Sequence, residues 1–257
     1  MPPRVVQATD VGHGPRAWYE SLPPITRAYG TVLAVLALSA SFKMITGFYL
    51  VLIWQRVFSH FEVWRPLTTF LFGGRVNLTL IFHLVWLVTY GKVLETQVFQ
   101  FQPADYLFML LFGAASILAM GAVLQYTVGV ALLVNAAALI FMVMYVWSRH
   151  FPDQVLSIWG LFTIKAFYLP FFYVLLDYLV TTEIPWGPCL GIAAGHLYFY
   201  LEDLYPAMGG PRLLRTPQFL KNLLADWGVG RRTNTHAAPG QDAFRAFQGR
   251  GQRLGAS

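Results

Sequence analysis

Four ionisable side chains lie inside long apolar runs of the sequence: His83, Lys165, Asp177 and His196. Charged groups at membrane depth are costly, and they usually face protein, water or each other and mark a functional position. His196 is of particular interest because histidine is the usual general base for an activated nucleophile. The first chemistry to consider is therefore hydrolysis of a peptide bond within a membrane.

The other residues that such hydrolysis needs are missing. No serine lies between Thr127 and Trp147, and no serine in an apolar run sits two residues after a glycine. The zinc-protease pattern HExxH is absent, and Asp177 is the only carboxylate well inside an apolar run. Metal-dependent and paired-carboxylate proteolysis therefore lack their residues. We expect no catalytic residue, no metal and no cofactor.

Transport of a solute is a second alternative. Pro170 and Pro185 can interrupt helices around a substrate. Lys165 and Asp177 are twelve residues apart, which is about 18 Å along a helix and too far for a direct pair. No internal repeat relates two halves of the chain, and no line of acids suggests ion coupling. The sequence therefore favours transport only weakly.

Two short patterns are candidates for contacts rather than chemistry. In Trp64-Arg65-Pro66 the arginine can extend to a lipid phosphate while the indole stays at headgroup depth. Gly187, Gly191 and Gly195 recur at every fourth residue, a spacing that lets a neighbouring helix approach closely. Their general interpretations are an anchor at the membrane interface and a helix-packing face.

The composition indicates that membrane helices position all of these groups. Of 257 residues, 56% are hydrophobic and only 12% are charged, against about 25% charged in soluble domains. A chain so poor in charge cannot cover a globular surface with polar side chains. The single cysteine, Cys189, excludes an internal disulfide and a cysteine-based metal cluster.

Six apolar runs are predicted to span the membrane. An even number places both termini on one side, and most Lys and Arg residues of the loops and tail fall on that side, so the positive-inside rule makes both termini cytosolic. The predicted spans are Ala28–Phe42, Leu78–Leu94, Tyr106–Leu124, Tyr126–Trp147, Ile158–Val180 and Gly187–Leu201.

The segment Met44–Phe61 is apolar but interrupted. Its large apolar residues, among them Trp54, Phe58 and Phe61, share one helical face, while Arg56 and Glu62 lie on another. A helix lying in the membrane interface and a short core-packed helix fit this pattern about equally well.

The chain is predicted to have three parts: a cytosolic segment at 1–24, a transmembrane domain at 25–206 and a basic cytosolic tail at 207–257. Eight Lys and Arg residues against two acids follow Tyr205. Thr216–Leu224 has the pattern of a short amphipathic helix. After Trp227 the abundance of Gly, Pro, Arg, Gln and Asn without a helical period predicts disorder.

Seven sequence stretches between Trp18 and Leu224 occur together in a recognisable order: LPPITRAYG, WRPLTTFLF, PADYLFMLLFG, VMYVWS, LFTIKAFYLPFFYVLLDY, GIAAGHLYFYLEDLYP and RTPQFL. With these stretches the sequence resembles a Derlin, a catalytically dead relative of the rhomboid proteases that works in degradation of endoplasmic-reticulum proteins. The resemblance implies an all-α membrane protein: a rhomboid-like six-transmembrane-helix bundle with an interfacial first loop and a disordered C-terminal tail. It also implies a multi-pass protein of the endoplasmic-reticulum membrane.

The resemblance gives roles to particular residues. Trp64 and Arg65 match the family's WR motif in the first lumenal loop, and Gly191 and Gly195 match the GxxxG motif of its sixth helix. His196 stands where active rhomboids hold their catalytic histidine, but the matching serine is missing, so the histidine has no nucleophile to activate. The first 17 residues and His83 receive no role.

The tail carries a separate resemblance. The stretch from Phe247 to Leu254, with Gly249 and Gly251 between them, is similar to the SHP box, a peptide that binds the amino-terminal domain of the valosin-containing AAA ATPase. Two apolar anchors in a flexible segment suit binding to a groove or sheet edge of a partner. The alternative is a solvated Gly/Arg tail that contacts RNA. The complete FxGxGxxL spacing favours the ATPase peptide, and we expect no nucleic-acid partner.

The expected function is to recruit misfolded proteins and to aid their retrotranslocation to the cytosol for ubiquitin–proteasome degradation, by distorting or thinning the bilayer and docking the ATPase. The expected partners are this ATPase, a membrane RING ubiquitin ligase complex, misfolded clients and membrane lipids. Self-association is left open. The alternatives are an active intramembrane serine protease and a membrane transporter.

Overall fold

The structure is a computed structural model that describes residues 14–158, 160, 162–211 and 213–227. Its elements are, in chain order, α1 (Pro15–Glu20), α2 (Pro24–Ser41), η2 (Gly47–Tyr49), α3 (Trp54–Ser59), α4 (Arg65–Leu71), α5 (Leu78–Trp86), η3 (Leu87–Gly91), η4 (Leu94–Val98), α6 (Pro103–Val128), α7 (Ala136–His150), β1 (Val155–Ile158), β2 (Phe162–Lys165), η5 (Ala166–Tyr168), α8 (Leu169–Thr181), α9 (Trp186–Phe199), η6 (Tyr200–Leu204), α10 (Tyr205–Ala207) and α11 (Gln218–Asp226).

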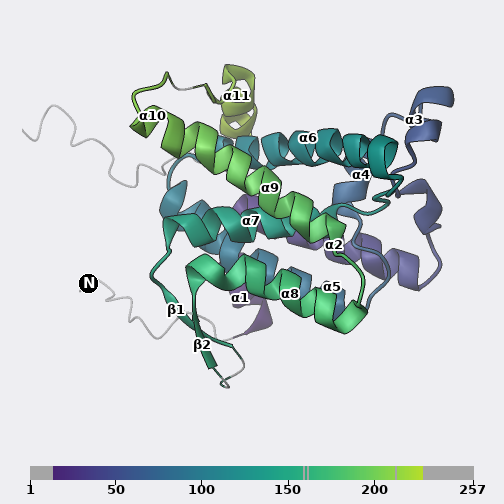
Figure 1. The fold of residues 1–257 in the computed structure, drawn as a ribbon, viewed down its shortest axis with the longest axis horizontal. Coiled ribbons are helices and arrows are strands. Elements are labelled where there is room, and N and C mark those ends of the chain that lie inside the picture. Colours follow the sequence, from purple (N-terminus) through teal and green to yellow (C-terminus); the bar gives the residue numbers. More distant parts are fainter. Residues whose placement is uncertain (1–13, 159, 161, 212, 228–257) are drawn as a thin grey trace, which may run out of the picture.

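Six helices in the described part of the chain correspond to the six predicted spans: α2, α5 with its extension, α6, α7, α8 and α9 (Figure 1). Leu78–Val98, which joins α5 to the π-helical segments η3 and η4, and Pro103–Val128 are long and apolar enough to cross a membrane. Ala136–His150 and Ala166–Thr181 are shorter apolar helices. The all-α membrane architecture predicted from the sequence is confirmed.

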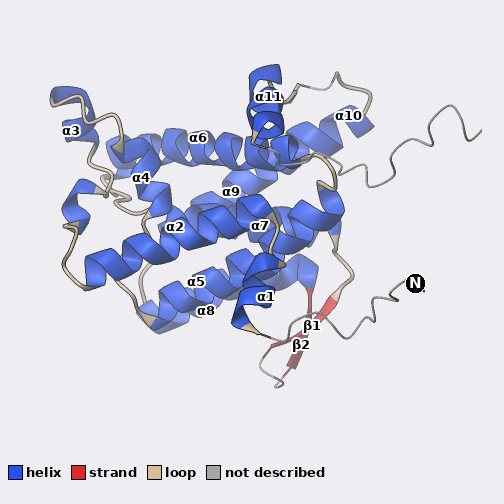
Figure 2. Ribbon diagram, turned by 180° about the vertical axis from the view of Figure 1, so that it is seen from behind, coloured by secondary structure: helices blue, strands red, loops and turns tan. Residues whose placement is uncertain are grey.

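α7 is the central helix of the bundle. Twelve of its fifteen residues are buried, because its sequence is apolar all round and neighbouring helices cover it on every side. It packs against α9, α6, α8, α4 and η3. Figure 2 shows α7 between α6 on one side and α5 and α8 on the other. The most buried helix, α7, is thus the packing partner of the glycine-rich α9.

Two opposite ends of the bundle carry different loops (Figure 1). At one end, here called the first-loop end, η2 and α3 lie beyond the carboxyl end of α2, and α4 returns to pack beside α2. At the other, the hairpin end, lie the β1–β2 hairpin and α10. α11 packs on α6 and buries Leu220 and Leu224, which confirms the amphipathic helix predicted at Thr216–Leu224. The predicted tail disorder lies outside the described residues.

The predicted fifth span, Ile158–Val180, is wrong at its start. Val155 pairs with Lys165 and Ile158 with Phe162 in an antiparallel hairpin, and the turn holds Gly160 at a φ of +74°. Short apolar runs on either side of a glycine can form the two strands of a hairpin as readily as a helix. Lys165 is therefore not an intramembrane charge, and its ammonium lies 3.1 Å from a carboxylate oxygen of Asp153 at an exposed site.

The predicted fourth span, Tyr126–Trp147, also starts too early. α6 continues to Val128, where Gly129 adopts a left-handed conformation at a φ of +80° and ends the helix. α7 begins only at Ala136. The intervening chain packs on the first loop, because the amide of Asn135 donates to the carbonyl of Thr69 at 3.0 Å.

The interrupted segment Met44–Phe61 contains only η2 and the six-residue α3, which buries none of its residues. The core-packed alternative is therefore excluded. Phe58 and Phe61 are 67% and 79% exposed, so an interfacial position stays the prediction for this segment.

Candidate functional site

Arg65 is the central anchor of the first loop. Its guanidinium is fully buried and donates from Nη1 to the carbonyls of Phe48 at 2.6 Å and Val51 at 2.7 Å, while its Nε donates to the carboxylate of Glu62. The sequence pattern predicted an arginine that extends to lipid phosphate. That prediction is wrong, because carbonyls and a carboxylate of the loop itself take up the charge.

Glu62 completes this anchor. The hydrogen bond from Arg65, with the charges of Arg65 and Arg56, lowers the pKa of Glu62 below its usual value, although desolvation opposes this shift. Arg56 Nη1 lies 3.6 Å from the second carboxylate oxygen. One carboxylate thus joins two arginines from separate parts of the loop.

Trp64 behaves differently from its neighbour, because 49% of its side chain is exposed. Phe58, Phe61, Val63 and Leu67 are exposed on the same loop segment. The two residues of the WR pair therefore have different roles. The buried arginine holds the loop in place, and the exposed tryptophan is part of an apolar surface of the protein. This surface, formed by Phe58, Phe61, Val63, Trp64 and Leu67, is called the aromatic loop surface below.

The glycine pattern of α9 is a close-packing face against α7. A Cβ added at Gly191 would lie 2.1 Å from the carbonyl oxygen of Ala138, and one at Gly195 would lie 2.9 Å from a ring carbon of Tyr145. A Cβ at Gly187 would meet nothing within 4 Å. The close approach of α9 to α7 therefore requires glycine at positions 191 and 195, but not at position 187.

His196 faces a tyrosine. Its Nδ1 lies 2.7 Å from the hydroxyl of Tyr145 on α7, and the two rings meet edge to face with centroids 6.0 Å apart. The histidine and the helix-packing face are therefore one unit, since Tyr145 also contacts Gly195.

The other two ionisable side chains predicted at membrane depth are not brought together with His196 by any contact between described residues. His83 lies beside Trp86 and Phe141, with ring centroids 5.5 and 6.2 Å away. Asp177 is half-buried on α8. Neither position adds a partner for catalysis.

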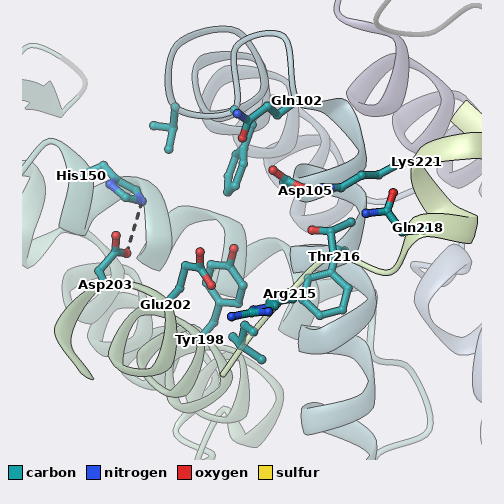
Figure 3. A pocket seen from close by; sticks show the side chains of 14 residues that line it. Gln102, Asp105, His150, Tyr198, Glu202, Asp203, Arg215, Thr216, Gln218 and Lys221 are labelled. Atoms are coloured by element: carbon teal, nitrogen blue, oxygen red, sulfur yellow. Dashed lines mark ion pairs between the residues drawn. The ribbon is translucent and has the colours of Figure 1, made fainter. Parts of the chain in front are cut away.

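A polar cavity of about 530 Å³ lies at the hairpin end, between the ends of α6, α7 and α9–η6 and the segment leading to α11 (Figure 3). Acidic and basic side chains face one another across it, and His150 Nε2 lies 3.9 Å from a carboxylate oxygen of Asp203. The sequence analysis missed this cavity because its residues come from η4, α6, α7, α9, η6 and α11 and from the loops beside them, which are far apart in the sequence. The charged groups lining it are Asp105, His150, Glu202, Asp203, Arg215 and Lys221.

Glu95 is a second residue that the sequence analysis missed. Although buried, it accepts hydrogen bonds from the amides of Ile25 at 2.9 Å and Thr26 at 2.8 Å. Its carboxylate thereby satisfies free amides at the start of α2. The sequence signal that could have identified Glu95 was its position as the second residue of η4, within an apolar run. The predicted ATPase-binding residues Phe247, Gly249, Gly251 and Leu254 lie outside the described residues.

The fold and these contacts define the class: a helical membrane protein packed around the central helix α7. A model of the Der1-like family matches residues 22–218. Derlin-2.1 of Zea mays is 40% identical over 218 residues, which cover 82% of this chain and 87% of that protein. A probable derlin-2 homolog of Dictyostelium discoideum is 40% identical over 208 residues, covering 80% and 82%. Derlin-1.2 of Zea mays is 36% identical over 246 residues, covering 93% and 98%.

The chain therefore belongs to the Der1-like family, the Derlins. Membership implies a role in endoplasmic-reticulum-associated degradation and a rhomboid-like protein that is not a protease.

Proposed function

We propose that this protein recruits misfolded proteins at the endoplasmic-reticulum membrane and eases their passage to the cytosol by thinning the bilayer around it. The observation that carries the proposal is the length of α8. Together with the three residues of η5, its 13 residues form one apolar helix, Ala166–Thr181. This helix rises about 24 Å, against a hydrocarbon core of about 30 Å. Leu175, Leu179 and Val180 on this helix are exposed, so the short helix lies where lipid would meet it.

A short helix at the lipid boundary favours local thinning, since otherwise its ends would leave polar groups in hydrocarbon. Thinning lowers the cost of moving a polar client segment through the membrane. Of the six predicted spans, the first and the last, Ala28–Phe42 and Gly187–Leu201, are the shortest. Instead α2 has 18 residues, and α9 continues through η6 into α10 as far as Ala207. The proposed thinning is thus assigned to α8.

The aromatic loop surface is the proposed first contact for clients. Misfolded proteins expose apolar segments, and an exposed aromatic patch held on a fixed loop can bind them without a defined sequence. The buried Arg65 supports this role because it holds the loop in one conformation.

Absence of proteolysis fits the surroundings of His196. Its Nδ1 is engaged by the hydroxyl of Tyr145, which occupies the position that a serine nucleophile would need beside the histidine. The histidine then serves helix packing, and this supports a pseudoprotease without a catalytic serine.

The force for extraction is proposed to come from the valosin-containing AAA ATPase, bound through Phe247, Gly249, Gly251 and Leu254, with both termini in the cytosol. A membrane RING ubiquitin ligase complex would mark the emerging client. The basic residues after Tyr205 support this orientation.

Lengthening α8 tests the thinning step. Four apolar residues inserted after Leu179 add about 6 Å of helix, and we expect a slower client decay in a chase experiment at equal expression. The control carries four Gly/Ser residues after Gly160 in the hairpin turn. Unchanged client decay in the lengthened variant would remove α8 from the mechanism.

Two further experiments distinguish this function from the protease and transporter alternatives. A protease would label with a serine-reactive probe and cleave a transmembrane substrate after purification. A transporter would take up solute in sealed vesicles and would not respond to loss of the tail peptide.

A further inference from the structure

Two cationic side chains share a cavity at the first-loop end of the bundle. The cavity has a volume of about 400 Å³, and its lining contains Lys43 and Arg75 but no acidic residue. Among the described residues, neither Lys43 nor Arg75 forms an ion pair or a side-chain hydrogen bond. Two like charges that face one cavity without a counter-ion favour an anion between them. The full lining is Ala40, Lys43, Ile45, Thr46, Gly47, Phe48, Phe72 and Arg75.

The backbone holds Lys43 at this position despite a steric cost. Its φ of +58° is left-handed, and its amide bonds to the carbonyl of Ala40 at 3.2 Å, while that of Met44 bonds to Ser39 at 2.9 Å. This pair of hydrogen bonds is a Schellman helix end, in which glycine is the favoured residue at the left-handed position. A lysine there places its ammonium beside the end of α2.

Arg75 comes from a separate segment that is tied to the same helix end. The amide of Val76 donates to the hydroxyl of Ser41 at 2.9 Å, which fastens the chain after α4 to the last residue of α2. A Cβ at Gly47 would lie 3.1 Å from the ring of Phe72, so η2 packs closely against that ring. The two cations are thus held on a fixed frame.

The surroundings of the cavity select the rest of the ligand. Phe42 and Met44, the chain neighbours of Lys43, are among the most exposed apolar residues of the described chain. An exposed apolar face of α2 runs from Phe42 back toward the middle of the helix. Its residues follow the helical spacing of three and four: Val32, Val35, Leu38 and Phe42. A ligand that fits both features has an anionic head and a long apolar chain.

We propose that this cavity is a binding site for an anionic phospholipid of the leaflet that surrounds the first-loop end. Lys43 Nζ and the Arg75 guanidinium bind the headgroup phosphate, where arginine offers several donors in a planar fork and lysine a compact charge. The acyl chains lie along the exposed face of α2. The site depends on the membrane fold and does not rest on the proposed degradation function.

Native mass spectrometry of the purified full chain in mild detergent tests the site, with phosphatidylserine and phosphatidylcholine as probes. We expect phosphatidylserine to bind more tightly. Each cation removed weakens its binding about fivefold, since a Lys or Arg near an anionic lipid contributes about that factor. Lys43→Gly combined with Arg75→Gln brings phosphatidylserine to the level of phosphatidylcholine, whereas Lys43→Arg retains binding.

Lys43→Gly also separates lipid binding from helix capping. Glycine suits the left-handed position better than lysine does, so this variant keeps or raises the thermal midpoint of unfolding while it loses lipid. The matched control, Arg16→Gln with Lys221→Gln, removes two cations elsewhere and leaves binding unchanged.

Two results would overturn the proposal. One is phosphatidylserine binding that survives the double substitution at Lys43 and Arg75. The other is inorganic phosphate displacing the lipid at concentrations comparable to the lipid itself, which would make the cavity a site for a soluble anion.

Discussion

Glu95 holds Thr26 by two hydrogen bonds, with one carboxylate oxygen 2.8 Å from the Thr26 amide and 2.7 Å from its hydroxyl. The other oxygen accepts from the amide of Ile25 at 2.9 Å. The end of the second span therefore caps the start of the first. A buried carboxylate is costly to place in the bundle, and these three donors offset that cost.

Glu95→Ala should lower the free energy of unfolding of the purified chain by about 2–4 kcal/mol, because buried donors at the start of α2 lose their acceptor. Glu95→Gln keeps one acceptor oxygen and should cost less. Thermal unfolding in detergent measures both. Thr26→Val is the matched control for the hydroxyl bond alone, and a Glu95→Ala variant no less stable than Thr26→Val would contradict the capping role.

Substitutions along α9 should have graded effects. Gly191→Ala directs a Cβ at the carbonyl oxygen of Ala138, which is backbone and cannot yield, so it should destabilise the fold by about 2–3 kcal/mol. Gly195→Ala meets the ring of Tyr145, which can shift, and should cost less. Gly187→Ala meets nothing within 4 Å and should be neutral. An equal loss of thermal stability at all three positions would refute the packing model.

The sequence was sufficient to predict the packing face of α9, because small residues at a four-residue spacing can be recognised without a structure. It was not sufficient to distinguish Gly187 from Gly191, since only the approach of Ala138 makes one of them indispensable. The six helices could be predicted for a similar reason: apolar length is a local property. The hairpin at Val155–Lys165 was missed because a run of apolar residues fits a strand or a helix equally well.

Arg65 illustrates what local pattern cannot supply. Its pairing with the carbonyls of Phe48 and Val51 depends on a loop that turns back on itself, and no spacing rule predicts that turn. The cavities at the two ends have the same origin, because each collects side chains from elements far apart in the sequence.

The attachment of the first loop should weaken in acid. The pKa of Glu62 is lowered, first by the hydrogen bond from Arg65. A lowered folded-state pKa means that its contribution is present above the unfolded-state pKa, near 4.3, and is lost as the pH falls through the folded-state value. Hydrogen exchange of the amides between Phe48 and Leu52 should therefore accelerate as the pH is lowered from 5 toward 3, after correction for intrinsic rates.

Glu62→Gln should remove this pH dependence and give faster exchange at every pH. Arg65→Lys should also loosen the loop, because an ammonium cannot reproduce the fork that serves Glu62 and two carbonyls. A loop whose exchange stays unchanged in Arg65→Lys would show that the guanidinium is not its anchor.

Substitutions in the tail should affect ATPase binding without affecting the stability of the membrane domain. Phe247→Ala with Leu254→Ala should abolish co-purification of the AAA ATPase, because the peptide loses both apolar anchors. The thermal midpoint of the membrane domain should not change. Phe244→Ala, three residues before the motif, is the matched control. ATPase binding that persists in the double variant would place the contact elsewhere.

His196 should be dispensable for client degradation. Its visible role is one hydrogen bond to the Tyr145 hydroxyl, so His196→Ala should cost about 1 kcal/mol of stability and leave client decay unchanged at equal expression. Tyr145→Phe removes the same bond without touching the histidine and should give a similar loss of stability. A different outcome would be informative: if His196→Ala stopped client processing while Tyr145→Phe did not, and both were equally stable, the histidine would be acting as a base and the non-proteolytic assignment would fail.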